Sequence, residues 1–373
     1  MKSFVYPYEL TEQVLAAQTL CAAAAGCPDL APEDFLAEAV FFDIETTGLS
    51  PEISSVYLIS VLTFESGQGT VTQWFADDYH SEAAVLAAFG ELLSKKRFLL
   101  HYNGTGFDLP YLTRKWQAAG MPYSFDSCIS LDFYKLLGTC RKKLPLENLK
   151  LVTVEAFLGI RRLDPYNGGE LISVYGDYLK RRICHQEGAE DLLASLLLHN
   201  REDVTALPEI APLLSVPALF DGRIHQAAVT RSGQECRISF RPEAPLPAKG
   251  MLHADRYALS FAGEDCLLQV PLFSGTLRHF FADYREYFYL PEEDEAIHKS
   301  VGTFVDPAHR RKATAATCYT RKEGLFLPLP KADRAAFGGY PLFFTSYKTE
   351  PAYLEFTENF PADAYVKAIL KAF

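Results

Sequence analysis

The stretch FFDIETTGLS (residues 41–50) places two acids, with one residue between them, at the end of an apolar segment. AVFFDIE (residues 39–45) reads as a buried strand, so Asp43 and Glu45 would project from the same face of it. Two like charges there repel each other and lose hydration, which costs free energy. A divalent cation would remove both penalties, because Mg²⁺ and Mn²⁺ prefer carboxylate oxygens. A solvated strand end is the alternative interpretation.

Two later segments carry further acids in suggestive positions. In HYNGTGFDLPYL (residues 101–112), Asp108 follows a strand-like run and begins a helical one. It is either a site residue or a helix cap. In LLLHNREDVTAL (residues 196–207), His199 and Asp203 are four residues apart, so one helical turn puts them on the same face. An ordinary helix face with a structural histidine is the alternative.

The hydrophobic pattern around these segments predicts an α/β domain. Strands are expected at 39–45, 54–67, 69–78 and 97–104, a strand running into a helix at 127–137, and helices at 81–96, 107–120, 146–159, 170–183 and 189–214. Tight turns would make the first three strands antiparallel, whereas the helical crossovers that follow make parallel pairs. We therefore expect a mixed sheet between layers of helices.

The character of the sequence changes near residue 215. Upstream, residues 1–37 look like a helical N-terminal extension and residues 38–214 form the predicted α/β domain. Downstream, in residues 215–373, Gly, Pro and aromatic residues separate short strand-like runs, and the last twelve residues look helical. This pattern predicts a second, β-rich (α+β) domain.

Composition narrows the class of protein. The 373 residues carry a net charge of −11, which argues mildly against a generally basic nucleic-acid binder and suits an enzyme that holds cations with carboxylates. The eight cysteines form no CxxC pair, and no export signal or uninterrupted apolar stretch of membrane-spanning length is evident. We expect reduced thiols, a cytoplasmic location and no membrane span.

Together the three acidic segments resemble the three exonuclease motifs of the DEDD (DnaQ-like) 3′–5′ exonucleases of the ribonuclease H-like superfamily. The resemblance is closest to the YprB-like ribonuclease H-like domains, which share the HN-x-x-DV form seen from His199 onward. It covers roughly residues 38–214. It implies a ribonuclease H-like three-layer fold with a mixed five-stranded sheet. The implied function is 3′–5′ exonucleolytic hydrolysis of single-stranded DNA or RNA.

The resemblance also implies a set of four metal-binding carboxylates: Asp43, Glu45, Asp108 and Asp203. In the family these hold two Mg²⁺ or Mn²⁺ ions. Phosphodiester hydrolysis needs an activated water, a neutralised phosphate and a stabilised leaving group, which two metal ions supply. We expect Asp43 to bridge both ions and Glu45 and Asp203 to bind the ion on the nucleophile side. Asp108 would reach the other ion.

The expected general base departs from the family pattern. The family uses a Tyr four residues before the last acid or a His five residues before it. Here His199 stands at the tyrosine spacing and Leu198 at the histidine spacing. A histidine can accept a proton near neutral pH, so His199 is a candidate base, with a structural role as the alternative.

Residues next to the acids are candidate substrate contacts. Thr46, Thr47 and Gly48 would form a turn that receives the nucleic-acid end. Asn103 would either contact substrate or hold the turn before the second motif's helix. Asp132 would be a supporting acid or, more simply, a helix N-cap.

A basic segment stands out in the second domain. Residues 298–322 contain six Lys or Arg against one acid: Lys299, Arg310, Arg311, Lys312, Arg321 and Lys322. Basic side chains neutralise phosphates and neighbouring aromatic rings stack unpaired bases, so Lys299, Arg310, Arg311 and Lys312 are candidate nucleic-acid contacts. The alternative is a buried aromatic core with solvated charges, and the acids at 292–296 could pair with the basic segment.

Two other functions fit the same motifs. One is a nucleic-acid-binding or scaffold protein with little turnover, and the other is a ribonuclease H-like endonuclease. The complete acid set favours catalysis, and the last acid on a late helix favours the exonuclease branch. DNA and RNA are equal alternatives on this evidence, and so are the possible roles of the second domain.

Overall fold

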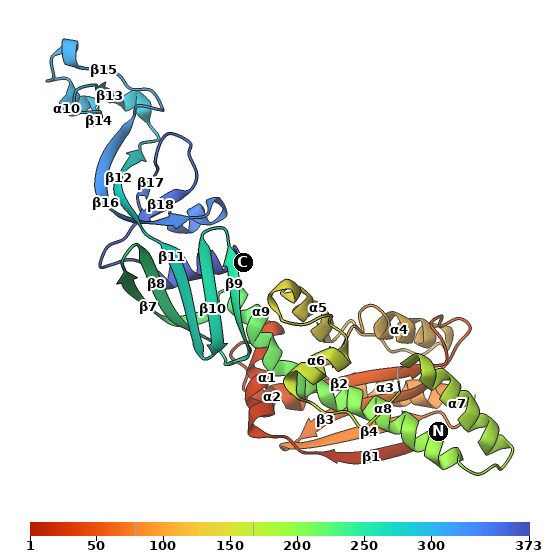
Figure 1. Cartoon of the computed structure of the whole chain (residues 1–373). Helices are drawn as coiled ribbons and strands as arrows, with labels where there is room; N and C mark the ends of the chain where they lie inside the picture. Colours follow the sequence, from red (N-terminus) through yellow and green to blue (C-terminus); the bar gives the residue numbers. More distant parts are fainter. Residues whose placement is uncertain (79, 167) are drawn as a thin grey trace. The chain divides into compact units, whose positions relative to one another are not determined.

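A computed structural model describes residues 1–78, 80–166 and 168–373 (Figure 1). The chain divides into two compact units, Met1–Pro217 and Ala218–Phe373. All of the acids of the three motifs lie in the first unit, and the basic segment lies in the second.

The first unit is built on a six-stranded mixed sheet in the order β1-β4-β3-β2-β5-β6. Its strands are β1 (Lys2–Tyr8), β2 (Ala39–Thr46), β3 (Val56–Glu65), β4 (Gln68–Phe75), β5 (Phe98–His101) and β6 (Ile129–Asp132). Strands β2, β3 and β4 form the predicted antiparallel meander. Strands β5 and β6 are parallel to β2, as the helical crossovers require.

The prediction of five strands and a wholly helical N-terminal extension was wrong. Strand β1 pairs antiparallel with β4 and adds a sixth strand at the edge of the sheet. Its side chains alternate between half-buried and exposed, and Phe4 packs against the core. Pro7 cannot donate to a ladder, but an edge strand tolerates it. The predicted helices begin only after it, as α1 (Glu12–Ala24) and α2 (Pro32–Glu38).

The predicted helices follow in order, one of them shorter than expected, and a further helix at residues 215–220 was not predicted. They are α3 (Glu82–Leu93), α4 (Asp108–Ala118), α5 (Phe133–Gly138), α6 (Leu151–Leu158), α7 (Gly168–Ile183), α8 (Ala189–Ile210) and α9 (Ser215–Phe220), with 3-10 turns η1 (Arg141–Lys143) and η2 (Ala211–Leu214). The expected helix at 146–159 starts only at Leu151. Its C-cap is Gly159, whose φ of 77° lies in the left-handed region that favours glycine.

Helices cover both faces of the sheet, which gives three layers. On one face of β2, the Phe42 ring stacks on Phe89 of α3 with centroids 5.1 Å apart. On the other face, Asp43 meets Asn200 of α8. Alternation along the strand therefore directs apolar side chains toward α3 and the two motif acids toward α8.

The run Ala189–Phe220 is long and apolar enough to cross a membrane by length and composition alone, and its most apolar window has a mean hydropathy of 1.3. In this structure, however, 72% of its most apolar window is buried inside the protein. Leu193 and Leu196 of α8 belong to the core of the first unit. The apolar character of the run is thus accounted for by core packing.

The second unit is β-rich, as predicted, and contains three antiparallel sheets. The five-stranded sheet consists of β7 (Ile224–Ser232), β8 (Glu235–Pro242), β9 (Leu246–Ala254), β10 (Tyr257–Gly263) and β11 (Asp265–Pro271); the four-stranded sheet of β12 (Phe273–Phe280), β16 (Tyr319–Leu329), β17 (Leu342–Phe343) and β18 (Ala352–Glu355); the three-stranded sheet of β13 (Tyr287–Leu290), β14 (Glu295–His298) and β15 (Arg311–Lys312). The short helix α10 (Lys299–Gly302) follows β14, and the C-terminal helix α11 (Ala362–Leu370) packs on β7.

Candidate active site

A series of hydrogen bonds between buried polar side chains fixes the position of Asp43. Its Oδ2 accepts a hydrogen bond of 2.6 Å from Nδ2 of Asn200 on α8. The Oδ1 of Asn200 accepts from the Ser60 hydroxyl, whose Oγ in turn accepts from Nε2 of Gln73 at 2.7 Å. Asn200, Ser60 and Gln73 are fully buried. Because buried polar groups need partners, this chain fixes the orientation of the carboxylate.

Glu45, His199 and Asp203 converge from β2 and α8. Nε2 of His199 lies 3.5 Å from Oε1 of Glu45 and 3.5 Å from Oδ2 of Asp203. One ligand atom from each of the three lies within 4.8 Å of the others. Two elements far apart in sequence therefore bring two carboxylates together, which suits a divalent cation, and place the His199 ring beside them.

A residue that sequence analysis missed, Asp164, orients His199. Its Oδ2 lies 2.5 Å from Nδ1 of His199, and its side chain is only 1% exposed. An ionised carboxylate can only accept, so Nδ1–H donates to it. The other ring nitrogen, Nε2, is thereby directed at Glu45 and Asp203.

Arg162 orients Asp203 in the same way as Asp164 orients His199. Its Nη2 donates to Oδ1 of Asp203 at 2.5 Å, and its Nη1 lies 3.2 Å from Oε2 of Glu155. Glu155 of α6 is 1% exposed, and burial raises its pKa to about 7 despite the opposing effect of the guanidinium. The guanidinium thus links a buried acid of α6 to the last motif acid.

Glu202 anchors the segment that carries Arg162 and Asp164. Its Oε1 accepts from the backbone N–H of Leu163 at 2.9 Å, and its Oε2 accepts from that of Asp164 at 3.1 Å. Nε of Arg162 lies 3.7 Å from the same carboxylate. We call residues 162–164 the docked segment. It places one side chain on each of the two α8 residues of the third motif.

Asp108 is the first residue of α4 and is buried. The N-cap position belongs to Phe107, so Asp108 stands in the first turn of the helix, as expected of a helix-start acid, but is not the N-cap itself. A Cβ on Gly104 would lie 2.7 Å from Nδ1 of His101 and 3.3 Å from Oδ2 of Asp108. Only glycine allows the turn to pass this close to the acid.

Burial and mutual repulsion raise the pKa values of three motif acids, Asp43, Glu45 and Asp108. Burial, and then the charges of Asp203 and Asp108, hold the pKa of Asp43 well above its usual range. The same causes raise the pKa of Glu45. Burial raises the pKa of Asp108 to about 7. Bound divalent cations would offset the desolvation and repulsion of these oxygen donors, so the donor set fits Mg²⁺ or Mn²⁺.

The predicted substrate turn lies directly after Glu45. The Thr46 hydroxyl donates to the carbonyl of Gly48 at 2.9 Å. The Thr47 hydroxyl accepts from the backbone N–H of Ser55 at 2.8 Å. Both hydroxyls therefore hold the shape of the turn, and its use in substrate binding stays a prediction.

Asn103 and Asp132 form the turn that precedes Asp108. Asn103 has a φ of 58°, and its N–H donates to Oδ1 of Asp132 at 2.8 Å. The same oxygen accepts from the N–H of Tyr134 at 3.1 Å, so Asp132 is the N-cap of α5. This confirms the simpler of its two interpretations. Asn103 holds the turn and also lines a cavity next to the acids.

That cavity, of about 520 Å³, opens beside the motif acids. Its lining contains Asp43, Tyr102, Asn103, Tyr134, Arg141, Asn148, Leu149, Lys150, Leu151 and Asp203. The contribution of residues 141–150 was not predicted, although the run CRKK at 140–143 signals a local excess of basic residues.

In the second unit, acids neutralise part of the predicted basic segment. Arg321 lies 3.6 Å from Asp294 and 3.9 Å from Glu295, and Lys322 lies 2.7 Å from Glu355. The pairing of the acids at 292–296 with the basic segment is therefore confirmed for Arg321.

The remaining basic residues differ in their surroundings. Arg310 donates to the carbonyl of Gly302 and lies 4.6 Å from the centre of the Phe288 ring. Arg311 and Lys312 of β15 are exposed, and Lys299 begins α10. Their contact with nucleic acid stays a prediction.

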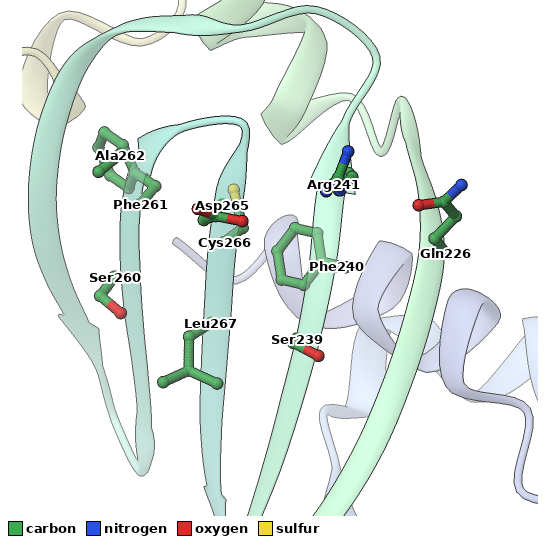
Figure 2. Close-up of a pocket in the computed structure, with 10 residues that line it drawn as sticks. All are labelled: Gln226, Ser239, Phe240, Arg241, Ser260, Phe261, Ala262, Asp265, Cys266 and Leu267. Atoms are coloured by element: carbon green, nitrogen blue, oxygen red, sulfur yellow. The ribbon is translucent and has the colours of Figure 1, made fainter.

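Another hollow, of about 510 Å³, lies on the five-stranded sheet of the second unit (Figure 2). Its lining mixes small polar and apolar side chains from β7, β8, β10 and β11, such as Ser239, Ser260 and Leu267. The guanidinium of Arg241 pairs with Glu264 at 3.2 Å. Among the described residues, the metal-ligand group lies instead on β2 and α8.

Comparison with known families agrees with this architecture. Residues 40–215 match the model of the RNase_H superfamily. The first unit has a ribonuclease H-like fold. This confirms the predicted fold class, which here has the additional edge strand β1.

The solved structures that the chain matches are distant from it. A family B DNA polymerase from the archaeon Pyrobaculum calidifontis is 15% identical with a TM-score of 0.37, and the match covers 66% of this chain and 35% of that one. The zinc-bound E. coli ExoI–ssDNA complex is 15% identical with a TM-score of 0.30, covering 56% and 55%. E. coli Exonuclease I with a 5cy-dT13 oligonucleotide is 17% identical with a TM-score of 0.27, covering 56% and 54%. No curated protein matches the chain significantly.

Proposed function

We propose that the protein is a divalent-metal-dependent nuclease of the DEDD type, akin to the YprB-like domains, that removes nucleotides from the 3′ end of single-stranded DNA or RNA in the cytoplasm. The observation that carries the proposal is the convergence of Glu45, His199 and Asp203 within 4.8 Å on two elements, next to half-buried Asp43. Four buried or half-buried acids and a histidine in a ribonuclease H-like fold suit phosphodiester hydrolysis.

Asp43, Glu45, Asp108 and Asp203 would hold Mg²⁺ or Mn²⁺, two ions in all. When bound, the cations would neutralise the scissile phosphate and promote ionisation of the attacking water. The protein prepares these carboxylates in advance. Asn200 orients Asp43 with a hydrogen bond of 2.6 Å, so the oxygen donors need little rearrangement before they bind.

His199 would accept the proton of the attacking water at Nε2. Its Nδ1 is already engaged by Asp164 at 2.5 Å, which holds the ring and stabilises the positive charge that proton uptake creates. Nε2 faces the oxygens of Glu45 and Asp203, where the water would be activated. The tyrosine spacing of His199 is thus compatible with a base role, because α8 presents this position to the acids.

The test uses 5′-labelled single-stranded DNA and RNA with Mg²⁺, Mn²⁺ or chelator. The wild type should produce a ladder that shortens from the 3′ end only with metal, and Asp43→Ala should abolish it. Asp126→Ala, which removes an exposed acid elsewhere in the first unit, is the matched control and should cleave normally. Discrete internal cuts would indicate an endonuclease instead. Binding without cleavage under either metal would refute the catalytic proposal.

A further inference from the structure

The cavity beside the motif acids has two chemically different walls. Asp43 and Asp203 belong to its lining, and so do Tyr134, Arg141 and Lys150 from the stretch that runs from α5 to α6. Its volume of about 520 Å³ is in the range of sites that bind small organic groups. A ligand in this cavity would lie against both the acids and the basic side chains.

The stretch from α5 to α6 is basic in an acidic protein. Residues 134–150 contain five basic residues and one acid: Lys135, Arg141, Lys142, Lys143, Lys150 and Glu147. Arg141, Lys142 and Lys150 are exposed, and in the described part of the chain no ion pair involves them. Their charges are therefore available to the phosphates of a ligand, in contrast to those of Arg321 and Lys322 in the second unit.

An exposed aromatic ring accompanies these charges. Tyr134 is 40% exposed and makes an edge contact with Tyr102, at a centroid distance of 5.9 Å. The Tyr102 hydroxyl donates to the carbonyl of Leu149 at 2.7 Å, which ties the ring to the segment before α6. Tyr134 thus has a fixed neighbour on one side and solvent on the other, which suits stacking of an unpaired base.

We propose that this cavity binds the end of a single-stranded nucleic acid, with Tyr134 stacking a base and Arg141 and Lys150 contacting phosphates. The proposal rests on the proposed nuclease function, because that function requires the end of the strand to lie at the motif acids. It commits to a single strand, because an unpaired base can turn its face to the ring, whereas the bases within a duplex are already stacked on both sides. It also places the main binding site in the first unit rather than on the basic segment of the second.

Binding is measured by fluorescence anisotropy of labelled oligo-dT and oligo-rU in chelator, where hydrolysis cannot interfere. Tyr134→Ala should weaken binding about tenfold, and Tyr134→Phe, which keeps the ring, should bind like the wild type. The double variant R141A/K150A should lower the slope of log Kd against log[salt] by about 1.4, or about 0.7 for each lost phosphate contact. A duplex of the same sequence should bind at least about tenfold more weakly.

The double variant R311A/K312A removes the same charge from the basic segment of the second unit, which is the competing candidate for the main binding site. A smaller loss of binding in this variant than in R141A/K150A supports the proposal; a larger loss would overturn it. Equal binding of Tyr134→Ala and Tyr134→Phe would also overturn it, once thermal denaturation shows both folded. If the cavity variants lose binding but the wild type never cleaves, the proposed function fails and the binding site stands.

Discussion

Nη2 of Arg162 lies 2.5 Å from Oδ1 of Asp203, while Oδ2 of the same carboxylate faces His199. One oxygen of the last motif acid is therefore fixed by a guanidinium, and the other is presented to the site. Such partners of a metal ligand commonly contribute about 10–100-fold to metal affinity or activity.

Removing this guanidinium should weaken metal binding. We expect Arg162→Ala to lower Mn²⁺ affinity about 10–100-fold in isothermal titration calorimetry. Arg162→Lys should have an intermediate effect, because lysine keeps the charge but not the planar fork. Arg161→Ala, an exposed neighbour, is the control. Equal affinity of Arg162→Ala and the control would contradict the positioning role.

Asp164 and His199 should act as one unit in turnover. Asp164→Asn replaces an acceptor with a group that can also donate, so the imidazole is no longer held in one tautomer. We expect a decrease in kcat of about 10²-fold or more for Asp164→Asn and for His199→Ala, with Mn²⁺ binding retained. The double variant should lose little further activity, because the two residues act together.

Leu163→Ala provides the matched control for that pair. Leu163 is 80% exposed, and its backbone N–H, which binds Glu202, is kept in the variant. It should turn over normally. Fully additive losses in the double variant would show that Asp164 does not act through His199.

Without cations, the folded protein should become less stable as the pH rises. Burial raises the pKa of Asp108 from 3.8 to about 7 in the folded chain. The folded state therefore binds this proton more tightly than the unfolded state does. The resulting stabilisation is complete below the unfolded pKa of 3.8 and is lost as the pH rises toward about 7. In chelator, we expect the Tm to fall by several degrees across this window in a thermal-shift experiment.

Adding Mn²⁺ should raise the Tm more at high pH than at low pH, because the ionised carboxylates bind the cation. Asp108→Asn, which cannot ionise, should reduce the pH dependence in chelator. A Tm that rises with pH over the same range would contradict the assignment of buried, repelling acids.

Gly104→Ala should damage both stability and activity. The added Cβ would lie 2.7 Å from the His101 ring and 3.3 Å from the Asp108 carboxylate, and forced contacts of this kind typically cost about 1–3 kcal/mol. Urea denaturation should show the loss. Gly138→Ala, where a Cβ would meet nothing within 4 Å, is the control and should be close to neutral.

Local periodicity explains which parts of the site were predictable. Asp43 and Glu45 follow a period of two on a strand, and His199 and Asp203 a period of four on a helix, so each pair could be placed from its spacing. Strand β1 was missed because a short edge strand containing Pro7 resembles an irregular lead-in to the helix that follows.

The supporting residues could not be found in this way. Arg162 and Asp164 lie in a stretch without helix or strand, and their partners on α8 are 41 and 35 residues away. No repeat connects such positions, since only the packing of the docked segment brings them together. Asn200 was visible within the third motif, but its contact with Asp43 joins residues 157 apart.

The docked segment makes site assembly an all-or-none local event. Glu202 binds two consecutive backbone N–H groups, so undocking would release Arg162 from Asp203 and Asp164 from His199 at the same moment. One local opening equilibrium would then set the fraction of molecules with an ordered base and an ordered last acid. The hydrogen-exchange rates of the Leu163 and Asp164 amides would report that fraction directly.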